Sequence, residues 1–150
     1  MRTIVLGIAI FTPLIFAGAE IASSQPALGL IGFRSPSNNI HCQYFEGGPN
    51  GPFEKSALRC DIKSMLNSPP RRPKDCDLEW GQAFEVSENN KPAERLCYGD
   101  TVADDRLPIL QYEDTWKRGQ FICKSERNGV SCITAKAHGF ELSRGAQRLF

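Results

Sequence analysis

The amino-acid sequence predicts an all-β fold: a small disulfide-stapled β-sandwich, or a partly open barrel, built of antiparallel hairpins. Three observations predict it. Short runs rich in β-branched and aromatic residues alternate with turn signals about every 8–12 residues. No long window after residue 20 has the 3.6-residue period of an amphipathic helix. The six cysteines, from Cys42 to Cys132, are an even number that suits a disulfide framework.

Turn signals bound the predicted strands. Ser, Pro and Asn at 35–38 close the first strand, a Gly-Pro-Asn loop at 47–52 joins the second to the third, and residues 89–92 turn the chain back again. A polar stretch at 113–119 separates two later strands, and Asn128-Gly129 is a strong hairpin signal. The predicted strands, in chain order, are residues 31–34, 39–45, 57–62, 80–86, 95–98, 109–112, 120–123, 130–134, 140–143 and 147–150.

The cysteines are predicted to pair locally. Cys123 and Cys132 flank the predicted Asn-Gly hairpin, Cys42 and Cys60 lie on the paired strands 39–45 and 57–62, and Cys76 is left to pair with Cys97. The short spacings typical of zinc ligands and of redox dithiols are absent from the sequence, so neither a metal nor any other cofactor is expected. An Ile precedes the first cysteine of each of the two predicted disulfide-linked hairpins. Two similar hairpins packed face to face would explain this internal similarity, and chance would explain it equally well.

The N-terminus predicts export. Arg2, the apolar run 4–16 and the small residues 17–19 make a secretory signal peptide over residues 1–19, cleaved after Ala19, with Ala22 or Ser24 as alternatives. A flexible lead-in over residues 20–30 and a single β-rich domain over 31–150 follow. The expected product is a secreted or periplasmic protein with no stable membrane anchor after cleavage, because no later apolar run is long enough to span a bilayer.

The charge balance excludes a class of partners. The 18 Lys and Arg face 17 Asp and Glu, and cleavage of the signal peptide removes one basic residue, Arg2. A neutral chain lacks the basic stripe of a nucleic-acid binder. Residues 68–73 contain three prolines, which predict an extended surface connection; a polyproline ligand for a partner groove is the alternative.

Several segments stand in an order that resembles an uncharacterised family of small exported bacterial proteins, a domain of unknown function. These segments are 33–42 (FRSPSNNIHC), 58–62 (LRCDI), 80–81 (WG), 97–101 (CYGDT), 123–126 (CKSE), 129–132 (GVSC) and 138–144 (HGFELSR). The resemblance spans about residues 33–145 and implies no activity. The chain has Asn38 and Ala137 where the family more often places Gly, which indicates altered turns, since Asn tolerates positive φ and Ala does so poorly.

Two histidines are the candidates for acid–base chemistry. His41 and His138, with Lys124 nearby, could cleave a phosphodiester without a metal. His41 adjoins a disulfide cysteine, however, and His138 precedes a Gly in a predicted turn, so a structural or surface role is the better interpretation of both. They are retained as possible contact residues.

Other candidates have simpler explanations. Asp100, Asp104 and Asp105 do not have the spacing of a calcium-binding loop, and turn capping accounts for Asp100. No serine lies in a nucleophile elbow. Most aromatic residues are expected in the core, and Trp116, in a polar segment, is the best candidate for an exposed contact.

The sequence therefore favours a non-enzymatic secreted or periplasmic binding domain, with no catalytic and no metal-binding residues assigned. The expected partner is a protein or an envelope ligand. Two alternatives remain open: a small secreted hydrolase that resembles a ribonuclease and uses His41 and His138, and an inhibitor of a secreted hydrolase.

Overall fold

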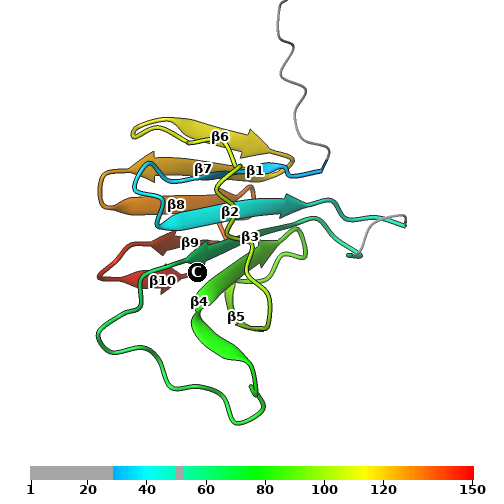
Figure 1. The fold of residues 1–150 in the computed structure, drawn as a ribbon. Helices are drawn as coiled ribbons and strands as arrows, with labels where there is room; N and C mark the ends of the chain where they lie inside the picture. The colour runs from blue at the N-terminus through cyan, green and yellow to red at the C-terminus, as the bar shows by residue number, and fades with distance from the viewer. Residues whose placement is uncertain (1–28, 50–52) are drawn as a thin grey trace, which may run out of the picture.

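The computed structural model describes residues 29–49 and 53–150, and this part of the chain consists of strands and loops without a helix (Figure 1). The predicted signal peptide, and the predicted lead-in except for residues 29 and 30, lie outside the described residues. No membrane-spanning helix occurs in the described ranges. The strands are β1 (Gly32–Arg34), β2 (Ile40–Phe45), β3 (Ala57–Ile62), β4 (Glu79–Ser87), β5 (Glu94–Tyr98), β6 (Thr115–Arg118), β7 (Phe121–Glu126), β8 (Gly129–Thr134), β9 (Gly139–Leu142) and β10 (Gln147–Leu149).

The strands form two antiparallel sheets of five strands each. Strands β1 to β5 lie side by side in chain order in the first sheet, and β6 to β10 do the same in the second. The two sheets share one core of buried side chains that come from both. The predicted all-β fold is confirmed, and of its two predicted forms the structure has the sandwich.

Each of the three disulfides joins a cysteine to the next cysteine along the chain, as predicted. Two of them connect neighbouring strands at directly opposite positions, β2 with β3 and β7 with β8. The third ties the long β3–β4 connection to β5. Loops of this length stabilise a fold by about 2.5–3.5 kcal/mol each in the chain-entropy view. The pairs are Cys42–Cys60, Cys76–Cys97 and Cys123–Cys132.

A row of four inward-facing residues crosses each sheet at its disulfide. Each row has an aromatic residue, the two cysteines and a second aromatic residue on consecutive strands. The first row is Phe33, Cys42, Cys60 and Phe84, and the second row is Trp116, Cys123, Cys132 and Phe140.

The two rows pack against each other in the core. The rings of Phe33 and Trp116 are 5.4 Å apart at one end, and those of Phe84 and Phe140 are 6.4 Å apart at the other. Between them, the sulfur of Cys132 and the two sulfurs of the Cys42 disulfide lie within 4.8 Å of one another. The two stapled hairpins thus do pack face to face, and each fully buried Phe contributes about 1.5–3 kcal/mol to stability.

One predicted strand is wrong. Residues 109–112 make only a single bridge, between Ile109 and Arg34, whereas β6 forms within the stretch that was expected to be a polar connection. An edge strand of four residues needs only one apolar side chain toward the core, here Trp116, so β6 shows no alternation in the sequence.

The two turn positions at which the resembled family more often has Gly both have positive φ. Asn38 has φ 55° and Ala137 has φ 61°. Both values lie in the left-handed region, where Asn is tolerated and Ala is strained. The strain at Ala137 is local to the β8–β9 turn.

We therefore predict that Ala137→Gly raises the free energy of unfolding by about 1 kcal/mol, because Gly adopts positive φ without a Cβ clash. Chemical denaturation of the disulfide-bonded protein measures this. The matched control is Ala135→Gly in the same turn, where φ is not positive; it should be neutral or destabilising. An equal gain from both variants would contradict the account.

Candidate functional site at the end of the sandwich

The connection between β5 and β6, residues 99–114, crosses the outer face of the first sheet, and we call it the strap (Figure 1). Polar side chains that point out of β1, β2 and β3 hold its backbone. Arg34 Nε donates to the Leu107 carbonyl at 3.0 Å and Gln43 Nε2 donates to the Val102 carbonyl at 2.8 Å. These hydrogen bonds hold the strap, which links the first sheet to the second, against the first sheet.

Asp61 and its partners anchor the start of the strap. This buried carboxylate accepts hydrogen bonds from Thr101 Oγ1 at 2.8 Å and from the Val102 amide at 2.9 Å. Arg59 pairs with the same carboxylate at 2.9 Å and also reaches the Asp100 carbonyl at 2.6 Å. A buried charge is tolerated here because it is paired and fully hydrogen-bonded.

His41 is a clamp for the strap. Its ring is completely buried, with Nε2 3.2 Å from the Asn38 carbonyl and Nδ1 3.1 Å from the Asp104 amide nitrogen. A ring that carries a proton on Nε2 donates to the Asn38 carbonyl, and an Nδ1 without a proton accepts from the Asp104 amide; the Asp104 carbonyl also lies 3.2 Å from Nδ1. Both nitrogens are thus used within the fold, and the ring offers no surface to a substrate.

The remaining acid–base candidates lie elsewhere. His138 is in the β8–β9 turn, and Lys124 is on the outer face of the second sheet. Hydrogen bonds to Glu126 and Glu113, with Lys124 Nζ at 3.1 Å and 3.3 Å, raise the pKa of Lys124. Because His41 and Lys124 sit on the outer faces of different sheets, the structure does not bring the predicted set together.

The acidic residues of the strap are also engaged locally. Hydrogen bonds from Arg106 lower the pKa of Asp104 to about 2, and a hydrogen bond from Asn38 lowers the pKa of Asp105. Within residues 29–49 and 53–150, no trio that includes these carboxylates comes within metal-binding distance. The one trio that does consists of disulfide sulfurs.

Trp116, predicted as an exposed contact, is half-buried. Its indole packs against the core beside Phe33, at one end of the two rows. Trp116 thus contributes to the contact between the sheets, and only part of its ring faces solvent.

A groove of about 560 Å³ lies at one end of the sandwich. Three turns from both sheets surround it: the β1–β2 turn, the β7–β8 turn and the β9–β10 turn. Its volume lies in the ordinary range for ligand sites. Its lining residues are Ser35, Ser37, Asn39, Ile40, Tyr112, Glu126, Arg127, Asn128, Gly129, Ser143, Arg144 and Gly145.

Several polar groups of this groove are used to build it. Ser35 Oγ accepts from the Ile40 amide at 3.0 Å, Ser143 Oγ accepts from the Ala146 amide at 2.9 Å, and Asn39 binds Ser64. These bonds fix the β1–β2 and β9–β10 turns, which gives the groove rigid walls.

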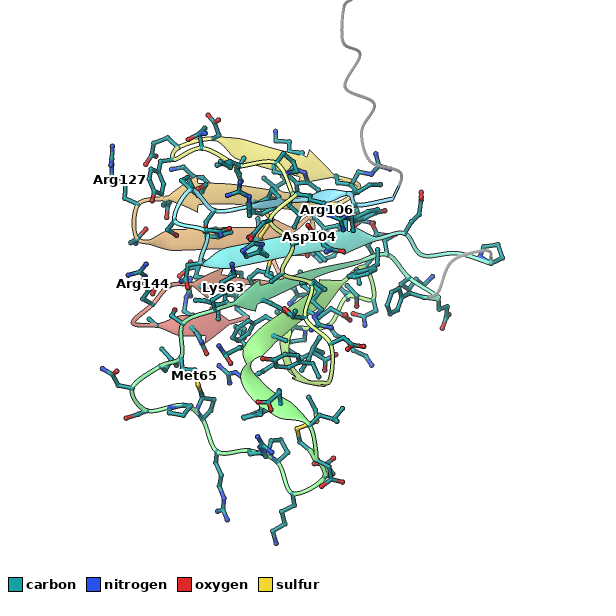
Figure 2. All side chains as sticks on the ribbon, viewed as in Figure 1. Lys63, Met65, Asp104, Arg106, Arg127 and Arg144 are labelled. Atoms are coloured by element: carbon teal, nitrogen blue, oxygen red, sulfur yellow. A yellow bond between two sulfur atoms is a disulfide. The ribbon has the colours of Figure 1, made fainter. Side chains whose placement is uncertain are left out.

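Other lining side chains are not used in this way, and Arg127 and Arg144 are the positively charged residues among them. Arg127, in the β7–β8 turn, and Arg144, in the β9–β10 turn, are exposed at the same end of the molecule (Figure 2). Among the described residues neither makes an ion pair; the Arg127 guanidinium lies 5.4 Å from the centre of the Tyr112 ring. Sequence reasoning missed both, although several of the segments that carry the family resemblance contribute to the groove.

We predict that His41→Ala lowers the free energy of unfolding by about 2–4 kcal/mol, because it leaves a cavity and two unpaired backbone groups under the strap. His138→Ala, the matched control, should change it by less than about 0.5 kcal/mol. Thermal and chemical denaturation measure both. A His41→Ala protein as stable as the parent would contradict the clamp.

Comparison with known proteins identifies the family of the chain. The sequence profile of a family of unknown function, DUF6636, matches residues 14–150. No curated protein and no solved structure matches the chain. The family resemblance predicted from the cysteine-centred segments is confirmed: the chain belongs to DUF6636, a family of unknown function.

Proposed function

We propose that the protein is a non-enzymatic binding domain and that the groove at the end of the sandwich is its binding surface. The observation that carries the proposal is the pair of arginines, Arg127 and Arg144, which have no acidic partner among the described residues and flank a rigid groove. Unpaired cations at the edge of a built hollow are groups left available for a partner.

The scaffold suits binding. The groove is made by turns from both sheets, and the stacked disulfide rows hold these sheets together. A surface that is already ordered loses little conformational entropy when it binds a partner. By contrast, the histidines proposed for hydrolysis are a buried clamp and a turn residue, an arrangement that favours binding over acid–base chemistry.

We further propose that the protein acts outside the cytoplasm of a bacterium, as a secreted or periplasmic protein. The three disulfides fit an extracellular, oxidising compartment. The N-terminal sequence supports export, with removal of residues 1–19. The partner is then an envelope component or another exported protein.

Site-specific photocrosslinking in the cells that make the protein tests the binding surface. A benzophenone side chain in place of Asn128, within the groove, should give adducts that depend on light, whereas the same group in place of Lys74, in the β3–β4 connection, should give none. The adducts should disappear when Arg127→Gln and Arg144→Gln are added, because these changes remove the unpaired cations.

Equal adducts from both positions, or adducts from neither, would contradict the groove as a binding surface. Hydrolysis of a defined substrate such as RNA by the purified protein, if His138→Ala abolished it, would contradict the non-enzymatic proposal. Non-reducing electrophoresis and the melting temperature verify that each variant is folded and fully disulfide-bonded.

A further inference from the structure

The chemistry of the groove indicates what kind of ligand it takes. A guanidinium can only donate hydrogen bonds, and its planar edge matches the two oxygens of a carboxylate or phosphate. Arg127 and Arg144 are therefore built to receive oxyanions. The one carboxylate in the lining, Glu126, is already engaged by Lys124 at 3.1 Å.

Neutral sugars fit this surface poorly. Recognition of sugar hydroxyls needs acceptors as well as donors. Ser35 and Ser143 already accept hydrogen bonds from backbone amides, and Ser37 is hydrogen-bonded to Ser35, which leaves few free acceptors beside the Asn128 amide. The ring of Tyr112, which could stack on a sugar, is covered on one side by the guanidinium of Arg127.

A dense polyanion also fits poorly. Glu126 lines the groove, Glu113 shares Lys124 with Glu126, and Glu126 and Glu141 both line a neighbouring hollow. A polymer with a phosphate on every unit would meet these charges along with the arginines. A ligand whose negative charges are spaced apart can reach Arg127 and Arg144 and avoid the acidic groups.

The groove continues into a second hollow, which points to an extended ligand. This hollow has a volume of about 250 Å³ and shares Glu126, Asn128, Gly129 and Ser143 with the groove. Its apolar lining consists of Val130, Leu142 and Ala146, of which only Ala146 is exposed, and its charged lining includes the ion pair of Glu141 with Arg148. A polypeptide can supply carboxylates for the arginines and an aliphatic side chain for this hollow on one chain, which an acidic glycan cannot.

We propose that the groove binds an extended acidic segment of a protein partner, with one carboxylate on Arg127, another on Arg144 and an apolar side chain in the second hollow. This inference rests on the proposed function, because it names the partner of the same surface. It assigns the β7–β8 and β9–β10 turns as the elements that determine specificity.

NMR titration of the disulfide-bonded protein tests the assignment with defined probes. The hexapeptide Glu-Gly-Leu-Glu-Gly-Glu should shift the amide signals of Asn128, Gly129, Arg144 and Gly145, whereas the peptide with Gln in place of each Glu should not. The affinity should fall as salt is raised. Arg127→Gln with Arg144→Gln should weaken binding by about tenfold or more.

The control variant is Arg71→Gln with Arg72→Gln, which removes the same charge from the β3–β4 connection and should leave the affinity unchanged. An equal loss in this control, or equal shifts from the Glu and Gln peptides, would overturn the proposal. So would tripolyphosphate or trigalacturonate if either shifted the groove amides at lower concentration than the acidic peptide. In those cases, photocrosslinks from position 128 that still depend on the two arginines would leave the proposed function standing.

Discussion

The contact between the two disulfide-centred rows is the constraint on which the rest of the structure depends. The disulfide at the centre of each row joins residues that lie directly opposite on neighbouring strands, so it fixes the register of those strands. Register decides which residues face the core, since a slip of one residue would turn every side chain to the other face. When the cysteines face the core, the aromatic residues of both rows face it too. Their rings then contact each other across the sheets on either side of the disulfides.

The same register places the residues that hold the strap on the outer face of the first sheet. Residues that alternate with Cys42 and Cys60, among them His41 and Asp61, must face out of the first sheet, and the strap lies across them. Their hydrogen bonds with its backbone fix the connection to the second sheet. The turns of both sheets then meet around one groove, so the function proposed for Arg127 and Arg144 depends on a core that neither residue touches.

Much of this fold was predictable because its signals are local. The hairpin turns lie between regular apolar runs, and the two turn positions with positive φ, Asn38 and Ala137, are those where the resembled family more often has Gly. The strand β6 escaped prediction because it has one inward residue, Trp116. The groove escaped because its walls come from turns far apart in the sequence, and only the packing of one sheet on the other brings them together.

The central claim is that two sheets, each stapled within itself, stack disulfide on disulfide. Because sulfurs from both sheets lie within 4.8 Å of one another, the direct rival is a disulfide between the sheets. Proteolysis of the unreduced protein at acidic pH, followed by mass spectrometry, distinguishes the two. The account predicts the linked peptides Cys42–Cys60, Cys76–Cys97 and Cys123–Cys132. A peptide that joins Cys42 or Cys60 to Cys123 or Cys132 would contradict it.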